Sequence, residues 1–172
     1  MPGPAETAAV TLGVDHKILR HGPVNSVAEA AAAQGVEVRD LVKTIVVRRA
    51  ADDYVFVLVP GDRQISWPKL RALLGVNRLS LPDAATAKEA TGYERGTITP
   101  FGSARPWPVI ADELTRGRTI NLGAGERGVG LQVAADQAVA ALGGTFADVT
   151  EAVWPERRDR SDVTGNGVTE AA

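Results

Sequence analysis

The most continuous apolar stretches of the chain lie in its first half and predict two neighbouring β-strands. Residues 43–47 (Lys-Thr-Ile-Val-Val) and 54–59 (Tyr-Val-Phe-Val-Leu-Val) are rich in β-branched residues, and the polar pair Asp52-Asp53 lies between them. Such runs, separated by a short polar turn, are typical of paired strands. Because both runs are apolar almost throughout, we expect both faces of these strands to be buried.

Helix-capping signals predict the helices. Ser26 and Glu29 form a capping box at the start of an alanine-rich run. The run ends at Gln34, and Gly35 stands where a helix C-cap belongs. By the same start and stop signals, further helices are expected at residues 66–74, 83–90 and 136–142.

The remaining segments predict a mixed fold. Residues 91–108 are rich in glycine, threonine and proline, which favours an irregular loop. Strands with interspersed helices, several joined by tight hairpins, predict a mixed α/β or α+β sheet. The shorter strands are expected at residues 17–20, 78–81, 109–111, 118–122, 129–133 and 145–149.

The two ends of the chain differ from its middle. Residues 1–13 are rich in proline, glycine and alanine without a clear period, and they predict a flexible segment or a short helix. At 172 residues the chain is expected to form one domain, which we assign to residues 14–154. Residues 155–172 contain no periodic apolar positions and predict a disordered tail.

Residues 123–128 (Gly-Ala-Gly-Glu-Arg-Gly) match the pattern G-x-G-x-x-G. In dinucleotide-binding folds this pattern joins a strand to a helix that holds the phosphates. Here the flanking residues, 119–122 and 129–133, both predict strands. A hairpin offers no helix N-terminus to a pyrophosphate, so the sequence disfavours a nicotinamide or flavin enzyme.

Composition removes several kinds of chemistry. The chain has no cysteine, which excludes disulfides, thiolate nucleophiles and cysteine-based zinc sites. The two histidines, His16 and His21, are too few for a usual metal site, and no G-x-S-x-G elbow accompanies them. Each histidine taken alone is better explained as structural or exposed. We therefore expect neither a metal nor a cofactor.

Charge and hydropathy bound the partners. The net charge of −2 argues against a general nucleic-acid coat. A local excess of basic residues at 36–80 is compatible with a few phosphate contacts, although a solvated face explains it better. No apolar run approaches the roughly 20 residues that span a membrane. The N-terminus lacks signal-peptide features, so we expect a soluble, cytoplasmic protein.

Two features remain that could carry chemistry. Lys43 begins an apolar strand, so its ammonium must reach a polar partner. A surface lysine and a clamp for an anion or carbonyl fit this position equally well. The loop at residues 92–102 holds three glycines and a proline, and it could present backbone N–H groups to a ligand. A plain surface loop is equally compatible with that composition.

Together these segments resemble the YbaK/ProX family of aminoacyl-tRNA deacylases, the trans-editing relatives of the insertion domain of bacterial prolyl-tRNA synthetases. The lysine of Lys-Thr-Ile-Val-Val and the loop Thr-Gly-Tyr…Thr-Pro-Phe-Gly, as an ordered pair, are the most specific part of the likeness. The matching pieces occur in order at residues 21–24, 42–47, 57–62, 91–102, 108–112 and 120–128.

The resemblance implies a single mixed α/β domain around a curved, largely antiparallel sheet with flanking helices. It implies hydrolysis of the ester that joins a wrong amino acid to the 3′-terminal ribose of a tRNA. Two amino acids that differ by one methylene differ in binding free energy by only about 1–3 kcal/mol, so a synthetase needs a second site that hydrolyses tRNA charged with the wrong small amino acid. A small amino acid such as alanine, cysteine or serine on tRNA(Pro) is the expected substrate, with a synthetase as a further partner. The alternative is a non-catalytic module that binds and regulates tRNA or a synthetase.

The resemblance also assigns candidate site residues. Lys43 matches the family's key lysine, and Gly96 matches its functional loop glycine. We expect the backbone N–H groups of Gly96 and Thr97 to serve as oxyanion donors, and Lys43 to clamp the terminal phosphate or the carbonyl. Phe101 is expected to wall the pocket or stack on the terminal adenine. The other residues expected to bind substrate are His21, Thr44, Thr99, Pro100, Gly102, Asp112, Asn121, Gly123 and Arg127.

Two positions depart from the family pattern. Some members have a serine in the glycine-rich hairpin where this chain has Gly123. Some members also have an aromatic hydroxyl near the first strand, and His21 is the nearest candidate for its place. Because of both departures, the family's substrate preference carries over to this chain less securely than the family's reaction does.

Overall fold

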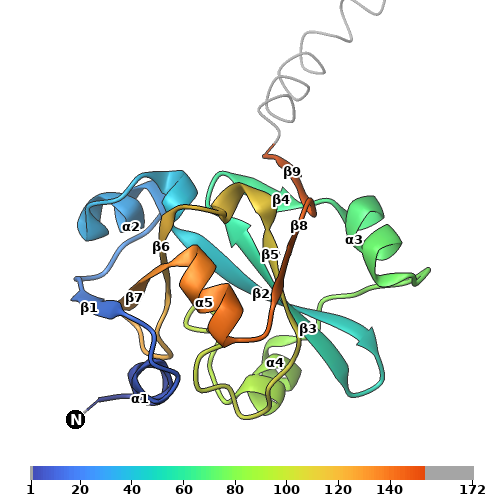
Figure 1. Ribbon diagram of the computed structural model, residues 1–172, viewed down its shortest axis with the longest axis horizontal. Helices are drawn as coiled ribbons and strands as arrows, with labels where there is room; N and C mark the ends of the chain where they lie inside the picture. Colours follow the sequence, from blue (N-terminus) through green and yellow to red (C-terminus); the bar gives the residue numbers. More distant parts are fainter. Residues whose placement is uncertain (1, 154–172) are drawn as a thin grey trace, which may run out of the picture.

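Antiparallel pairing of the two most apolar segments organises the molecule (Figure 1). The computed structural model describes residues 2–153, in which these segments form β2 (Val42–Ala50) and β3 (Asp53–Pro60). Asp52 forms the tight connection with a φ of 55°. Residues 54–60 of β3 are all buried, as predicted, whereas β2 is buried only in part.

The strands of the described chain pair in three sheets. Four of the six ladders are antiparallel, and β5 is parallel to both of its neighbours. A parallel bridge between Leu41 and Asn121 connects the sheet that contains β2 to the sheet that contains residues 119–123. The predicted mixed α/β class is therefore confirmed. The sheets are β2-β3-β5 (Val109–Asp112)-β8 (Thr145–Ala147), β1 (His16–Arg20)-β7 (Val129–Ala134)-β6 (Thr119–Gly123), and β4 (Arg63–Ile65)-β9 (Thr150–Ala152).

Three of the helices begin at the predicted caps, Ser26, Ser66 and Asp83, whereas the helix predicted from residue 136 begins at Ala135 without a side-chain cap. Ser26 Oγ accepts the Glu29 N–H at 3.0 Å, and Asp83 Oδ1 accepts the Thr86 N–H at 2.8 Å. Figure 1 shows α2 and α3 at opposite ends of the molecule. No helix among residues 2–153 is long and apolar enough to cross a membrane. The α-helices are α1 (Pro4–Thr11), α2 (Val27–Gln34), α3 (Trp67–Leu74), α4 (Ala84–Thr91) and α5 (Ala135–Ala141); the 3₁₀ turns are η1 (Val38–Asp40) and η2 (Glu113–Thr115).

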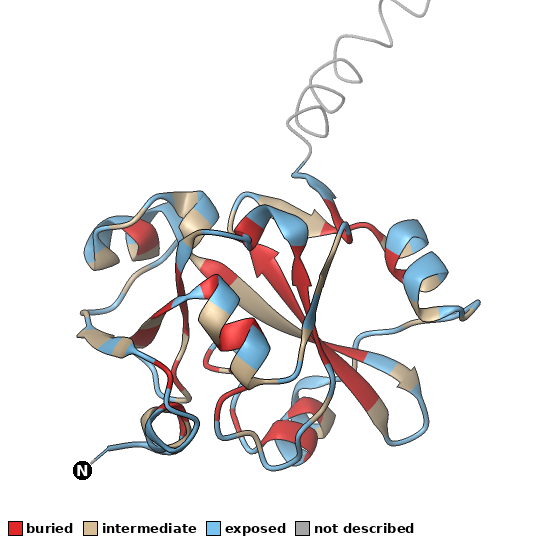
Figure 2. Cartoon of the chain, viewed as in Figure 1, coloured by how far each residue is buried: buried red, intermediate tan, exposed pale blue. Residues whose placement is uncertain are grey.

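Two hydrophobic clusters lie on opposite faces of β2 and β3. The buried residues of these strands are coloured red in Figure 2. Phe56 and Leu58 of β3 belong to the larger cluster, which also holds Phe101. Val55 and Val57 belong to the smaller cluster. Successive side chains of a strand point to opposite faces, so one apolar strand supplies both clusters.

Three details differ from the sequence prediction. Residues 78–81 form no strand, because only Ser80 pairs, with Arg48, in an isolated bridge. The strand predicted at 145–149 ends at Ala147, and the short pair β4-β9 was not anticipated. Of the two alternatives predicted for residues 1–13, a flexible segment or a short helix, the structure shows the helix, as α1 at residues 4–11. Its Ala5 and Ala9 are fully buried in the larger cluster. The tail predicted at 155–172 lies outside the described residues.

Candidate functional site

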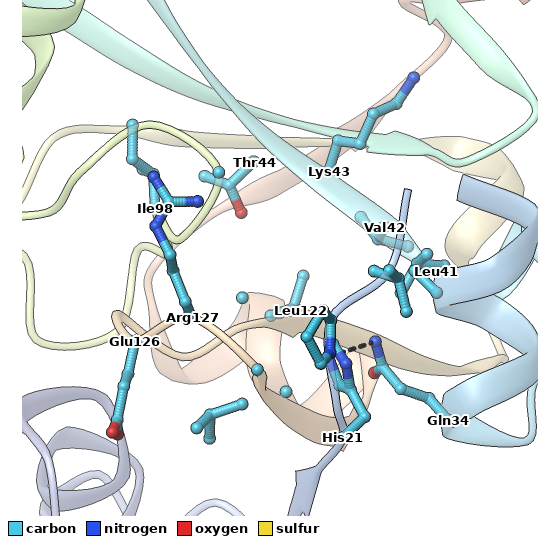
Figure 3. A pocket seen from close by; sticks show the side chains of 18 of the residues that line it. His21, Gln34, Leu41, Val42, Lys43, Thr44, Ile98, Leu122, Glu126 and Arg127 are labelled. Carbon is cyan, nitrogen blue, oxygen red and sulfur yellow. Dashed lines mark hydrogen bonds between the residues drawn. The ribbon is translucent and has the colours of Figure 1, made fainter. Parts of the chain in front are cut away.

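A cavity of about 750 Å³ lies between α2, the start of β2 and the turn that joins β6 to β7 (Figure 3). Segments distant in sequence line it, so the fold alone creates it. Six of the predicted site residues belong to this lining: His21, Lys43, Thr44, Gly96, Gly123 and Arg127.

Residues 123–128 form a hairpin turn on one side of the cavity, as predicted. The strand β6 ends at Gly123 and pairs there with Gly130 of β7. A Cβ atom on Gly123 would lie 2.9 Å from the Ile98 carbonyl oxygen and 3.0 Å from that of Thr97. Only a glycine allows the hairpin and the 96–98 loop to approach this closely.

Lys43 lies at the boundary of the cavity and is half-buried. Its Nζ donates a hydrogen bond to the Arg63 carbonyl oxygen at 3.0 Å. Figure 3 shows its side chain directed away from Thr44 and Arg127. Burial lowers the pKa of Lys43 below its usual value, and the charge of Asp62 opposes that shift. An ammonium carries three N–H donors, so two remain for a ligand.

The 96–98 loop meets only part of the expectation for oxyanion donors. The Thr97 N–H already donates to the Glu94 carbonyl oxygen at 2.9 Å, and the Thr97 hydroxyl donates to the same atom at 2.7 Å. Thr97 is also buried, so its predicted role as a donor is wrong in this structure. Gly96 does line the cavity, and no acceptor for its N–H is found within residues 2–153.

Thr44 and Arg127 present polar groups at the same end of the cavity (Figure 3). The Thr44 hydroxyl oxygen is buried and has no hydrogen-bond partner among the described residues. A buried hydroxyl without a partner costs about 1–3 kcal/mol. The Arg127 guanidinium lies beside Gly96, because a Cβ on that glycine would be 3.9 Å from Nη1 of Arg127. This end of the cavity therefore offers donors to an oxygen-rich ligand.

The remaining residues of the 99–102 loop, and Asp112, do not line the cavity, which corrects their predicted role. Phe101 is fully buried in the larger hydrophobic cluster, so it can neither wall the cavity nor stack on a base. Asp112 is equally buried and accepts the N–H groups of Leu114 and Val149. Thr99 and Pro100 are buried as well, and Gly102 packs against α1.

The Thr-Gly-Tyr motif holds that loop in shape. The Tyr93 hydroxyl donates to the Phe101 carbonyl oxygen at 2.7 Å, and burial raises the pKa of Tyr93 to about 12. The Thr91 hydroxyl donates to the Ala87 carbonyl oxygen at 2.8 Å. The motif thus acts on the cavity indirectly, by fixing the path of the chain that carries Gly96.

Asn121 lies behind the cavity wall and not in its lining. It is fully buried, and its Nδ2 donates to Gln34 Oε1 at 2.9 Å. Gln34 does line the cavity, beside His21. Gln34 was missed from the sequence because it is the last residue of an otherwise alanine-rich helix, where a polar side chain usually faces solvent.

The apolar part of the lining was also not predicted. The residues Val24, Ala30, Leu41, Val42, Ile98, Leu122 and Val129 supply it. Each one satisfies the ordinary pattern of a core position or a loop. No local signal distinguishes them from the rest of the hydrophobic residues, because it is the packing of four elements that brings them together.

Comparison with protein families gives a match over most of the chain. A family model described as "Aminoacyl-tRNA editing domain" matches residues 21–140. That range includes every residue of the cavity lining.

Individual relatives agree with this match. The Enterococcus faecalis protein named "Putative Cys-tRNA(Pro)/Cys-tRNA(Cys) deacylase EbsC" is 28% identical over 131 residues, which are 76% of this chain and 78% of that protein. The proline–tRNA ligase of Thermosipho melanesiensis is 35% identical over 96 residues. Those residues are 55% of this chain but 17% of the ligase, so the likeness concerns a small part of that enzyme.

A solved structure shares the fold. It is described as "Crystal structure of a putative trans-editing enzyme for prolyl tRNA synthetase" and superposes with a TM-score of 0.79 at 25% sequence identity. The superposition covers 88% of this chain and 99% of that chain. The fold and the family match therefore point to the same class of protein.

Proposed function

The chain belongs to the aminoacyl-tRNA editing domain family, and from this premise we propose that it clears small amino acids wrongly attached to tRNA(Pro). The reaction is hydrolysis of the aminoacyl ester at the 3′-terminal ribose. Alanine, cysteine and serine are the candidate substrates. We place the reaction in the cytoplasm because charged tRNA is its substrate, and a prolyl-tRNA synthetase is the candidate partner that presents it.

One observation carries this proposal. Lys43, Gly96 and Arg127, which come from three separate segments, meet at one cavity of about 750 Å³. A cavity of that size is within the range of small-molecule sites and holds an amino acid with part of its nucleoside. Its donor-rich end is suited to a carbonyl that becomes negatively charged.

The proposed mechanism needs no protein nucleophile. Oxygen of a water molecule attacks the ester carbonyl carbon, and the carbonyl electron pair moves to its oxygen. For this step the Lys43 side chain turns from the Arg63 carbonyl oxygen into the cavity, where its charge joins the Gly96 N–H and the Arg127 guanidinium in stabilising that oxyanion. When the carbonyl re-forms, the bond to the ribose oxygen breaks, and the ribose oxygen receives the proton that the water loses. Holding water and ester together supplies much of the rate.

The first prediction concerns Lys43. We expect Lys43→Ala to lower kcat/KM for mischarged tRNA by about 100-fold or more, because a charge that stabilises an oxyanion contributes on that scale. The fold should persist, with a Tm within about 4 °C of the wild type, because Lys43 is only half-buried. Release of labelled amino acid from tRNA(Pro) charged with alanine, cysteine or serine measures this effect.

Two controls make the test decisive. Lys17→Ala removes an exposed lysine of β1 outside the cavity and should leave kcat/KM unchanged. Correctly charged Pro-tRNA(Pro) should resist hydrolysis by the wild type. If Lys43→Ala hydrolyses the whole panel at the wild-type rate, Lys43 has no part in the mechanism. If the wild type binds these tRNAs without turnover of any, the chain is a binding module and the proposed function is wrong.

A further inference from the structure

Three side-chain amides form a directed chain of hydrogen bonds behind the cavity. Gln132 Nε2 donates to Asn121 Oδ1 at 2.9 Å, and Asn121 Nδ2 donates to Gln34 Oε1 at 2.9 Å. An amide has one oxygen and one NH₂ group, so each link fixes the orientation of the next. The chain therefore leaves Gln34 with its NH₂ group turned away from Asn121.

That NH₂ group meets His21 at the cavity wall (Figure 3). Gln34 Nε2 lies 3.5 Å from His21 Nε2, while His21 Nδ1 lies 2.8 Å from the Gly22 carbonyl oxygen. A carbonyl can only accept, so Nδ1 carries the proton and the lone pair of Nε2 faces Gln34. A distance of 3.5 Å exceeds the usual length of such a bond, about 2.9–3.0 Å.

Gly130 makes this arrangement possible. A Cβ atom on Gly130 would lie 2.6 Å from Gln34 Oε1 and 3.3 Å from Gln34 Cδ. Any larger residue would push the Gln34 amide out of the bond with Asn121. The backbone of β7 is therefore shaped around the same amide that the hydrogen-bond chain orients.

The cavity wall thus carries a donor, Gln34 Nε2, beside an acceptor, His21 Nε2. The contact between them is long, whereas each side chain makes a short hydrogen bond to another part of the protein. We propose that Gln34 and His21 form a hydroxyl-recognition pair: the hydroxyl accepts from Gln34 Nε2 and donates to His21 Nε2. This inference rests on the proposed function for its substrate, because a mischarged tRNA end carries such groups. Two sources share this chemistry, the ribose hydroxyl next to the ester and the side-chain hydroxyl of serine.

The orientation of the pair can be tested without any activity measurement. We expect long-range ¹H–¹⁵N spectra of the wild type to show His21 protonated at Nδ1. In Gln34→Glu, the introduced carboxylate accepts only, so His21 should gain a proton at Nε2. His16, whose Nδ1 lies 2.8 Å from the Val14 carbonyl oxygen, is an internal control that should not change. A wild-type His21 protonated at Nε2, or one unaffected by Gln34→Glu, would overturn the proposed arrangement.

The recognition itself needs four substrates. Acceptor minihelices charged with alanine or serine, each ending in adenosine or 2′-deoxyadenosine, separate the two sources of the hydroxyl. We expect the wild type to prefer one hydroxyl by about tenfold in kcat/KM, the scale of about 1.4 kcal/mol for one hydrogen-bonded group. The four substrates give two ratios of kcat/KM: serine against alanine, and adenosine against 2′-deoxyadenosine. Gln34→Met should abolish the ratio for the hydroxyl that the pair recognises and should leave the other ratio unchanged.

Variants separate recognition from loss of structure. Gln132 is outside the cavity lining and reaches Gln34 only through its hydrogen bond to Asn121. Gln132→Met should therefore weaken the same substrate preference. Gln137→Met makes the same chemical change on α5, away from the cavity, and should leave all ratios unchanged. If Gln34→Met keeps both wild-type preferences, the recognition pair is wrong. If the wild type hydrolyses none of the four substrates, the proposed function fails, and the spectra still decide the orientation.

Discussion

Gly123 sets how closely the β6–β7 hairpin approaches the 96–98 loop. A side chain at this position would place Cβ 2.9–3.0 Å from the two carbonyl oxygens of Thr97 and Ile98. We expect Gly123→Ser to displace that loop and to lower the free energy of unfolding by about 1–3 kcal/mol. Because Gly96 moves with the loop, the ratio of kcat/KM between alanine and serine substrates should also change.

Urea unfolding and the substrate panel measure both effects of Gly123→Ser. Gly3→Ser is the matched control, because a Cβ on Gly3 meets nothing within 4 Å. That control should keep wild-type stability and substrate ratios. Wild-type values of both quantities in Gly123→Ser would show that the loop yields without cost, and the close approach would then have no functional meaning.

Tyr93 links the Thr-Gly-Tyr motif to alkaline stability. Burial raises its pKa from 10.0 to about 12, so the unfolded chain loses this proton at lower pH than the folded chain. The stabilising contribution is therefore complete below pH 10 and is lost as the pH rises toward 12. We expect the free energy of unfolding to fall by about 2 kcal/mol over that range.

Tyr93→Phe isolates this contribution. The variant should lose about 1–2 kcal/mol at neutral pH, because the buried Phe101 carbonyl oxygen loses its donor. Its further decline between pH 10 and 12 should be smaller than that of the wild type. Urea unfolding at several alkaline pH values gives both numbers. An equal decline in the two proteins would assign the alkaline effect to another group.

At the scale of elements, α1 is an integral part of the fold. Alanine is the most frequent residue of its sequence, so no apolar period distinguishes it from a flexible lead-in. Its small residues nevertheless allow close packing: Ala5 and Ala9 are fully buried, and the Pro4 carbonyl oxygen would be 2.5 Å from a Cβ on Gly102. The helix therefore closes the core beside the 99–102 loop.

A pair of substitutions on α1 tests this packing. Ala9→Leu inserts a larger side chain at a fully buried position and should cost about 1–3 kcal/mol. Val10→Leu changes an exposed neighbour on the same helix and should stay within about 0.5 kcal/mol of the wild type. Thermal or urea unfolding compares the two. Equal stability of both variants would mean that α1 does not pack on the core in solution.

At the scale of the whole molecule, the cavity depends on both faces of one strand. Val42 and Val46 of β2 face the larger hydrophobic cluster, whereas Ile45 and Val47 face the smaller one. Lys43 and Thr44 are adjacent, so their side chains point to opposite faces of the strand, yet both line the cavity at the start of β2. This end of the strand is where the sheet containing β2 meets the sheet containing β6, through Leu41 and Asn121.

The candidate site was predicted best where a residue has a chemical reason to stand out. Lys43 at the start of an apolar strand, and the glycines of the hairpin, belong to this group. Phe101 and Asp112 resembled site residues in sequence but are buried structural groups. A polar or aromatic residue in a motif can either stabilise the fold or bind a ligand, and how far it is buried distinguishes the two roles. Gln34 shows the opposite error, because an unremarkable helix end carries a polar group of the cavity wall.

The sequence by itself determined the local structure of this protein: the apolar runs that pair as β2 and β3, the capped helices, and the glycine-rich turn as a hairpin. These follow from interactions between residues close in the chain, which a sequence displays directly. The tertiary structure decided which residues meet at the cavity, the packing of α1, and the amide chain from Gln132 to Gln34. Those features arise from contacts between residues far apart in the chain, such as Asn121 and Gln34, which are 87 positions apart, and only the packing of the strands and helices fixes such contacts.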